Sequence, residues 1–137
     1  MIKQRINEGV NEIFDPIRMV WLIETPEEIV RQRFIYYLLT LGYNKGHISV
    51  EYGFCLPSKK VQRADIIVFN RNGSPHILIE CKAESVKLTK EVFEQVSKYN
   101  NVIKAKFIII TNLKHNFIFE TNNFINYKPI TFFPKPE

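Results

Sequence analysis

The chain has 137 residues, of which 45% are hydrophobic and 24% charged, which is typical of one soluble globular domain. Its only cysteines, Cys55 and Cys81, lie outside any CxxC or Cys/His spacing, so neither a disulfide framework nor a zinc site is expected. The net charge of +5 is compatible with a polyanionic partner, and no apolar run approaches the ~20 residues that span a bilayer. We expect a single domain over 1–137, in the cytoplasm, with no membrane segment and no signal peptide.

The first 23 residues carry weak structural signals. Residues 1–18 mix charged and apolar side chains without a clear period, and this pattern predicts a short arm. Residues 19–23 form a compact apolar run, Met-Val-Trp-Leu-Ile, which predicts a short strand.

A helix is predicted from about 26 to 41. Thr25 can cap its N-terminus, and Pro26 suits the first helical position, where a missing N–H has no consequence. Apolar side chains then recur at helical spacing, and Gly42 is a plausible terminator.

Three strands are predicted next, at 47–54, 63–69 and 76–82, because these segments are rich in β-branched and aromatic residues. The linking segment 70–75 is dense in turn residues and contains an Asn-Gly pair. Two strands joined by so short a turn predict an antiparallel hairpin.

The C-terminal part predicts a helix at 89–100, a buried strand at 106–111 and its hairpin neighbour at 115–120. The helix separates the strand at 76–82 from the one at 106–111, so a parallel crossover is expected between them. The tail 127–137 contains prolines and should be extended. The fold class is therefore α/β, in the order α-β-β-β-α-β-β, with a central mixed sheet flanked by helices.

Three charged residues interrupt apolar strands, and they are the candidates for chemistry. Glu80 and Lys82 share one face of a strand because side chains alternate, and Asp65 lies on the predicted partner strand. Carboxylates near a core need a partner or a metal. Asp65 and Glu80 suit Mg²⁺, which lowers the pKa of bound water and stabilises charge on a phosphate. Lys82 would orient or help to deprotonate that water.

A structural salt bridge explains the same charges without any function. Asp65 or Glu80 would then pair with Lys82 or Arg63, and a D…ExK pattern of this spacing often occurs by chance. Glu51 is expected to face solvent rather than to bind a metal. From these residues alone, both explanations stay open.

Several blocks of the chain also occur together, in the same order, in a known nuclease family. They are 25–32, 63–68, 79–83, 95–100 and 110–112. The chain thereby resembles the PD-(D/E)XK nuclease superfamily and, more narrowly, the family of the type I restriction enzyme R-subunit N-terminal domain. The resemblance implies a restriction-endonuclease-like αβββαβ core, divalent-metal dependence and phosphodiester hydrolysis. The superfamily's proline before the aspartate is Ala64 here, and a glycine common in relatives is Leu113, which puts the geometry of that loop in question.

By position, the resemblance makes Asp65, Glu80 and the Cys81 backbone carbonyl ligands of Mg²⁺ or Mn²⁺. Lys82 becomes the catalytic lysine. Glu28 matches the helix-borne acidic residue of the superfamily, and Gln95 matches a glutamine of the helix after the ExK strand.

These accessory residues have rival explanations. Glu28 also completes a capping box with Thr25, which explains it about as well as catalysis does. Tyr99 lies one turn after Gln95 on the same helix face and is a tentative DNA contact, and either residue also suits a packing or surface role.

The leading hypothesis is a Mg²⁺-dependent DNA endonuclease in restriction or repair. Lys59, Lys60, Arg63 and Lys87 are candidates for contacts with the DNA backbone, although each is more often a solvated surface charge. The alternative is a nuclease-fold module that binds DNA or a partner subunit without useful turnover. A homodimer or a larger restriction or repair complex is compatible with either hypothesis.

Overall fold

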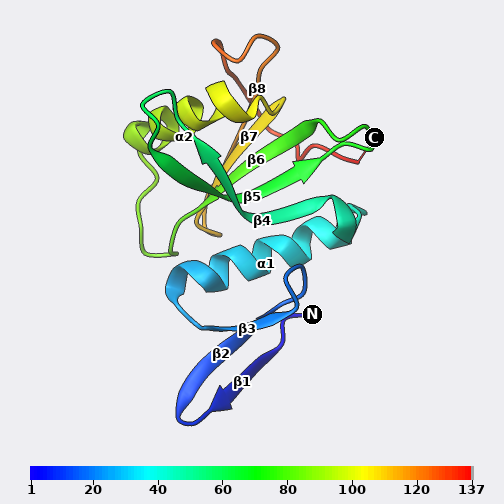
Figure 1. The fold of residues 1–137 in the computed structure, drawn as a ribbon, viewed down its shortest axis with the longest axis vertical. Helices are drawn as coiled ribbons and strands as arrows, with labels where there is room; N and C mark the ends of the chain where they lie inside the picture. Colours follow the sequence, from blue (N-terminus) through cyan, green and yellow to red (C-terminus); the bar gives the residue numbers. More distant parts are fainter. Residues whose placement is uncertain (137) are drawn as a thin grey trace.

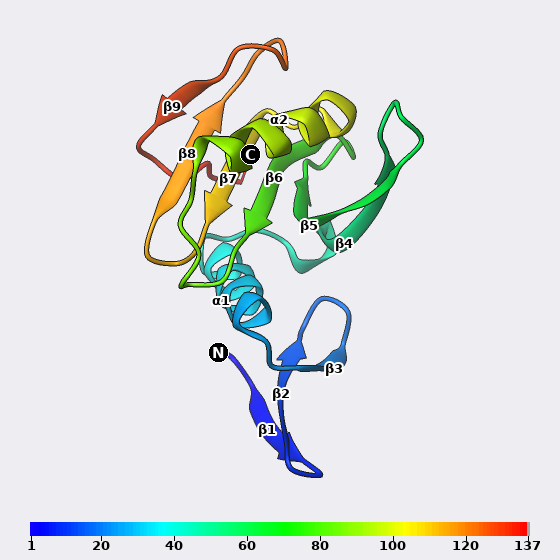
Figure 2. The same cartoon turned by 90° about the vertical axis from the view of Figure 1, so that its left-hand side faces the viewer.

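The computed structural model describes residues 1–136 and contains a six-stranded mixed sheet between two helices. Figures 1 and 2 show α1 and α2 on opposite sides of this sheet, with the N-terminal strands apart from it, beyond α1. Two buried clusters fill the layers. Alternate residues of the strands contribute to them: Ile66, Ile77 and Ile79 pack towards α1, whereas Ile67 and Leu78 pack towards α2.

The sheet has the strand order β4-β5-β6-β7-β8-β9. In chain order, the strands of this sheet and the helices beside it are α1 (Pro26–Thr40), the 3-10 turn η1 (Lys45–His47), β4 (Ile48–Cys55), β5 (Val61–Phe69), β6 (Pro75–Cys81), α2 (Lys90–Ile103), β7 (Phe107–Thr111), β8 (Asn116–Glu120) and β9 (Lys128–Ile130). Strands β5 and β6 form the predicted antiparallel hairpin, and β6 pairs in parallel with β7 through the predicted crossover. The predicted α/β class is therefore confirmed, with boundaries within a few residues of those expected.

Helix α1 begins as the sequence predicted. The Thr25 hydroxyl accepts a hydrogen bond from the Glu28 backbone N–H at 3.1 Å, and Pro26 occupies the first turn. The helix gives way to Gly42, whose φ of 98° lies in the left-handed region that glycine adopts easily. Val30, Phe34 and Leu38 of this helix are buried against the sheet.

The tail is extended, as predicted, and it also joins the sheet. Strand β9 pairs with β8 in antiparallel register, with Ile118 opposite Ile130. Beyond it, the buried Tyr43 hydroxyl donates a hydrogen bond of 2.6 Å to the Pro134 carbonyl, so the end of the described chain packs against the segment after α1.

The N-terminal segment differs from the predicted arm. Strands β1 (Gln4–Asn7), β2 (Val10–Asp15) and β3 (Val20–Ile23) form a second, three-stranded antiparallel sheet. Glu8 and Gly9 both have positive φ and make the tight turn between β1 and β2. Strand β2 packs against α1. The strand predicted at 19–23 is confirmed as β3.

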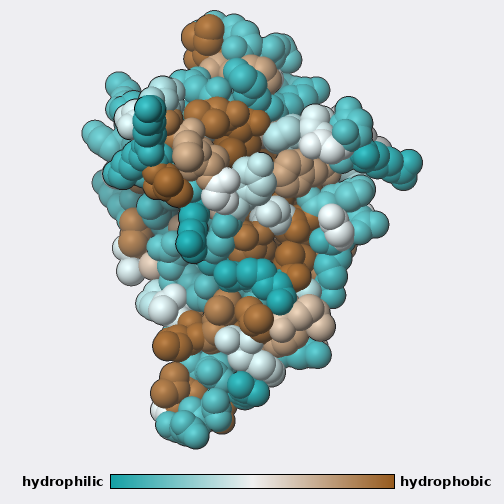
Figure 3. Space-filling model, viewed as in Figure 1, coloured by the Kyte–Doolittle hydropathy of each residue, from teal (hydrophilic) through white to brown (hydrophobic). Residues whose placement is uncertain are grey.

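Side-chain contacts hold this second sheet together. The Phe14 and Trp21 rings meet edge to face at 5.2 Å, and the fully buried Asp15 accepts backbone hydrogen bonds from Ile17 and Arg18 in the turn before β3. Apolar groups also reach the surface here, at the bottom of Figure 3, including Ile6, whose exposed fraction is 74%. The sequence of residues 1–18 shows no alternation of apolar and polar side chains, because both kinds occur on each face of these strands.

Asn100 at the end of α2 supports a stability prediction. Its fully buried amide donates to the Ala105 carbonyl at 2.9 Å and accepts from the Ala105 N–H at 2.8 Å, and it also donates to the Tyr127 hydroxyl at 3.0 Å. Asn100→Ala leaves these buried groups without a partner and should lower the free energy of unfolding by about 2–4 kcal/mol in urea denaturation. Asn101→Ala, at the neighbouring exposed position, should change it by less than about 1 kcal/mol. Equal effects of the two substitutions would contradict this role.

Candidate active site

The β5–β6 hairpin brings Asp65 and Glu80 side by side. Ile66 is paired with Ile79, so the residues one step further along each strand, Asp65 and Glu80, face each other across the ladder. Asp65 is 7% exposed, and its Oδ2 accepts a hydrogen bond of 2.8 Å from the Cys81 backbone N–H. The strand pairing predicted from the sequence thus places the two carboxyl groups at one point of the sheet.

The Glu80 carboxyl group is strongly perturbed. Burial, followed by the negative charge of Asp65 and a hydrogen bond with its carboxyl group, raises the pKa of Glu80 to about 8, although the nearby Lys82 ammonium lowers it. Near neutral pH, Glu80 therefore holds its proton more tightly than an ordinary glutamate does. Two adjacent carboxyl groups that hold a proton between them can exchange it for a cation.

Lys82 lies beside this pair. Its Nζ is 3.3 Å from Glu80 Oε2, and its side chain is 26% exposed. Burial lowers the pKa of Lys82, but the charge of Glu80 and the hydrogen bond to it have a larger effect, so this pKa is raised overall. The ammonium group consequently stays charged at neutral pH, which suits an electrostatic role beside a phosphate better than a role as base.

Arg31 on α1 is a site residue that the sequence reasoning missed. It is 6% exposed, and its Nη2 lies 3.1 Å from Asp65 Oδ1 and 2.7 Å from Glu51 Oε1. Its Nη1 is 3.1 Å from Glu28 Oε1. One signal was available in the sequence: Arg31 follows Val30 and precedes Phe34 on the apolar face of the helix, where a cation needs anionic partners.

Glu51 was expected to face solvent, and this expectation was wrong. Its side chain is 25% exposed and is paired with Arg31. Glu51 has a φ of 56°, an unusual value within a strand, and it interrupts the β4–β5 pairing between Val50 and Tyr52. With this backbone conformation, the Glu51 side chain points towards Arg31. The alternation of side chains along a strand does not predict this orientation.

The contacts of Glu28 distinguish between its two explanations. Its backbone N–H takes part in capping, but its carboxylate contacts Arg31 and accepts a hydrogen bond of 3.0 Å from the Gln32 side chain. The Thr25 backbone N–H donates instead to the Ile23 carbonyl, so the reciprocal half of a capping box is not formed. The Glu28 side chain therefore belongs to the cluster around Arg31.

Helix α2 places Tyr99 near the same cluster and leaves Gln95 exposed. Tyr99 is 8% exposed; its hydroxyl donates to Gln62 Oε1 at 3.2 Å and its ring meets Phe54 edge to face at 5.3 Å. Burial, and then the charge of Glu80, raise the pKa of Tyr99. Tyr99 is thus packed beside the site, and the tentative DNA contact assigned to it stays a prediction.

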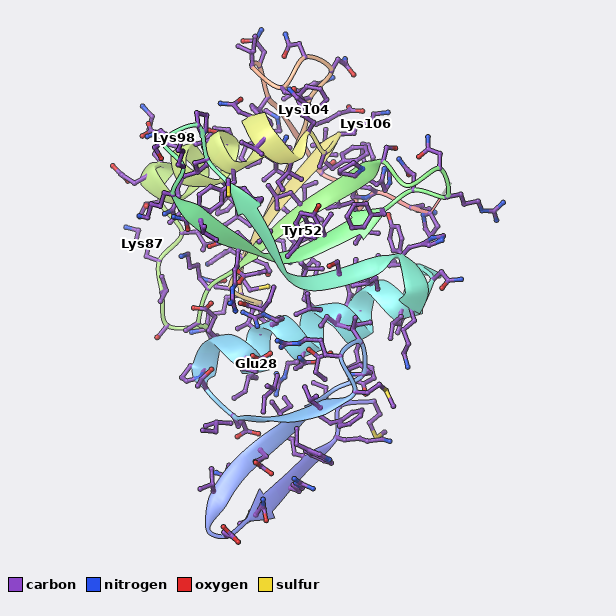
Figure 4. All side chains as sticks on the ribbon, in the orientation of Figure 1. Glu28, Tyr52, Lys87, Lys98, Lys104 and Lys106 are labelled. Atoms are coloured by element: carbon purple, nitrogen blue, oxygen red, sulfur yellow. The ribbon has the colours of Figure 1, made fainter. Side chains whose placement is uncertain are left out.

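The predicted basic residues Lys59, Lys60, Arg63 and Lys87 are all exposed. The Arg63 guanidinium is 3.8 Å from Glu51 Oε2, at the edge of the acidic cluster. In Figure 4, Lys87 and Lys98 lie at α2 and the loop before it, whereas Glu28 lies on α1. Lys98 on α2 was not among the predicted contacts, since a single lysine on an exposed helix face carries no signal.

The donor set fits a hard divalent cation that keeps much of its water. Among residues 1–136, no three His, Cys, Asp or Glu side chains form a metal-binding group, because Glu28 and Glu51 are directed to Arg31. The Asp65–Glu80 pair supplies two oxygen-bearing groups, and Mg²⁺ is commonly bound by one or two carboxylates plus water and substrate oxygens. The Cys81 carbonyl remains a predicted third ligand, and the buried Cys81 thiol, whose pKa burial raises well above its ordinary value, is no thiolate ligand.

Comparisons with known proteins give a family and a similar fold. The family model described as "Type I restriction enzyme R protein N terminus (HSDR_N)" matches residues 26–134. A solved structure of a fragment assigned as an HsdR subunit of a type I restriction enzyme from Vibrio vulnificus YJ016 is similar in fold, with a TM-score of 0.61 and 21% sequence identity. The similarity covers 82% of this chain but 24% of that chain, so this chain spans about a quarter of its length.

No curated protein matches the sequence significantly. Within the described residues, neither helix has the length and apolar character needed to cross a membrane.

The family match covers most of the sequence, including Arg31 and the whole β5–β6 hairpin. The chain therefore belongs to the family of type I restriction enzyme R-protein N-termini.

Proposed function

We propose that the chain is a divalent-metal-dependent deoxyribonuclease domain of the PD-(D/E)XK type that acts in DNA restriction. The observation that carries the proposal is the Asp65–Glu80 pair, two adjacent carboxyl groups on neighbouring strands with the Lys82 ammonium 3.3 Å from Glu80. Structural salt bridges account for Asp65 facing Arg31 and for Glu80 facing Lys82. They do not explain why the two carboxyl groups also lie against each other at a buried point of the sheet.

The chain's own residues have distinct tasks in this proposal. Asp65 and Glu80, with the Cys81 carbonyl, would hold Mg²⁺ or Mn²⁺, which supplies an activated water and neutralises charge on the phosphate. The charged Lys82 orients that water and stabilises the negative charge that develops on the phosphate oxygens. The Arg31 and Cys81 hydrogen bonds fix the Asp65 carboxylate in position.

The exposed lysines would bind the phosphate backbone. Lys59 and Lys60 lie in the loop between β4 and β5, and Lys87 lies in the loop that follows β6. These loops adjoin β5 and β6, the strands that carry the site, and β4, which pairs with β5. Contacts of this kind fix the position of DNA without reading its sequence, so any sequence preference would come from partner subunits or other domains.

The proposal is tested with purified protein on plasmid and linear DNA. Cleavage should require Mg²⁺ or Mn²⁺ and should stop when EDTA removes the metal. An Asp65→Asn variant purified in parallel should be inactive, which excludes a contaminating nuclease. Metal-independent cleavage, or equal cleavage by the two proteins, would show that the assignment is wrong.

A second candidate is a binding module that carries the nuclease fold without useful turnover. It is favoured by one observation: the Arg31 guanidinium is already paired with Asp65 and Glu28, and its positive charge opposes that of a metal. Such a module should bind DNA at low salt without any metal, and its affinity should fall steeply as salt rises. Absence of DNA binding at low salt would exclude it. The larger restriction complex, a homodimer and the cytoplasmic location stay predictions for either candidate.

A further inference from the structure

Arg31 is placed where an isolated cation is rarely found, inside the apolar face of a helix. Its guanidinium contacts Glu28 at 3.1 Å, Glu51 at 2.7 Å and Asp65 at 3.1 Å, with Glu27 more distant at 3.9 Å. The three nearer carboxylates come from α1, β4 and β5, so one side chain connects three elements of the fold.

The charges around the site are unequal. Five carboxyl groups, those of Glu27, Glu28, Glu51, Asp65 and Glu80, face two buried or half-buried cations, Arg31 and Lys82. Two further cations lie at the margin: the exposed Arg63, near Glu51, and Arg18, which is paired more closely with Asp15 than with Glu28. Burial lowers the pKa of Arg31, but the charges of Asp65, Glu28 and Glu51 raise it, so its charge persists at any ordinary pH. The charge of Arg31 is therefore a fixed component of the electrostatic field at Asp65.

The same contacts also fix the orientation of Asp65. Its Oδ1 accepts from Arg31 and its Oδ2 accepts from the Cys81 backbone N–H, so rotation of the carboxylate would break one of two buried hydrogen bonds. A carboxylate oxygen has a second lone pair, and both oxygens therefore retain a site for a metal or a proton.

We propose that Arg31 is an internal counter-cation that limits the affinity of the Asp65–Glu80 pair for divalent metal and holds Asp65 in its orientation. Arg31 is thus a positioning residue whose charge opposes the metal and whose hydrogen bonds prepare its ligand. This role rests on the proposed function. It explains why Glu28 and Glu51 point at a guanidinium rather than completing an all-carboxylate metal cage.

Removal of the charge alone should strengthen metal binding. In Arg31→Gln, the divalent ion no longer faces a nearby positive charge, and Glu28 and Glu51 become free to approach it. We expect Mn²⁺ to bind at least ~10-fold more tightly by isothermal titration calorimetry, a modest effect for one charge within a few ångströms of a divalent ion. A purely structural role predicts the opposite, because disorder of Asp65 would weaken binding.

Two further variants separate charge from geometry. Arg31→Gln combined with Glu51→Gln removes one charge of each sign, so the affinity for Mn²⁺ should return to within ~3-fold of wild type, even though Asp65 and Glu28 lose the guanidinium as a partner in both variants. Arg31→Lys keeps the charge but not the forked donor, so it should bind Mn²⁺ as wild type does and yet cleave DNA more slowly. Circular dichroism and thermal unfolding would establish that each variant is folded.

The outcomes distinguish the inference from the proposed function. Tighter Mn²⁺ binding by Arg31→Gln that is reversed in the double variant supports the role of Arg31. Wild-type-like or weaker binding by folded Arg31→Gln, or tight binding that persists in the double variant, would overturn it and leave the nuclease proposal intact. Absence of Mn²⁺ binding by wild type and by all variants would overturn both.

If Arg31→Gln does not fold, the double variant and Arg31→Lys decide: Mn²⁺ binding that differs from wild type by more than ~10-fold in either would also overturn the role.

Discussion

Asp65→Asn and Lys82→Met should both reduce metal-dependent DNA cleavage by at least ~10³-fold, but for different reasons. The asparagine removes the charge that, with Glu80, attracts the metal, and its single oxygen cannot accept from both Arg31 and Cys81 as Asp65 does. The methionine leaves the Asp65–Glu80 pair in place and removes only the ammonium group 3.3 Å from Glu80.

Metal binding measured apart from activity separates the two variants. Calorimetry with Mn²⁺ should show no binding to Asp65→Asn and at least wild-type affinity in Lys82→Met, because the methionine removes a positive charge near the metal. Glu84→Gln, at an exposed position two residues after Lys82, is the matched control and should cleave and bind as wild type does. Wild-type cleavage by Lys82→Met would show that the lysine has no role in turnover.

Glu80→Gln should stabilise the metal-free protein at high pH while it abolishes metal binding. The pKa of Glu80 is about 8 in the folded protein, against an ordinary value of 4.5. Between these values, the folded state binds a proton that the unfolded state has released, so the free energy of unfolding falls as pH rises. This loss begins near pH 5, is complete just above pH 8, and does not occur in the glutamine variant.

Denaturant titrations at pH 5 and pH 8.5 without metal would measure this effect. The stability of the variant relative to wild type should increase between the two pH values by an amount on the order of a few kcal/mol. Addition of Mg²⁺ at pH 8.5 should stabilise only the wild type, because metal binding to the native state shifts its unfolding equilibrium. A parallel pH dependence of the two proteins would contradict the raised pKa of Glu80, and equal stabilisation by Mg²⁺ would contradict its role as a ligand.

The proximity of the proposed reacting residues could be predicted from the sequence because they lie within one local unit. Asp65, Glu80 and Lys82 occupy two strands joined by a short turn, and charges in apolar strands are visible without knowledge of distant contacts. The parallel crossover followed from the helix between β6 and β7 by the same local reasoning. The family resemblance supplied the order of the surrounding blocks, which the single D…ExK pattern could not provide.

The parts that escaped prediction depend on contacts between distant segments. Arg31 meets Asp65 across 34 positions of sequence, and no local pattern indicates that approach. Glu51 reaches the same guanidinium through a backbone conformation that is unusual for a strand. Strand β9 contains Pro129 at the sheet's edge, where a proline is tolerated but is seldom predicted as a strand.

One loop shows how a substitution can keep its inherited geometry. Leu113 stands where the family resemblance leads us to expect glycine, and its φ is 74°, in the left-handed region that glycine adopts without strain. The Leu113 side chain packs against the cluster that includes Phe34. The doubt about this loop is therefore resolved in favour of the glycine-type backbone, with apolar burial offsetting the strain.

The position of the N-terminal sheet bears on where the independently folding unit begins. The family match begins at residue 26, one position after the residue that caps α1. Strand β2 lies against the helix that carries Glu28 and Arg31, and the Arg18 guanidinium is 4.0 Å from Glu28. A protein shortened to the matched region would lose both the cap and this cover, so it should be less stable than the chain that includes the N-terminal sheet.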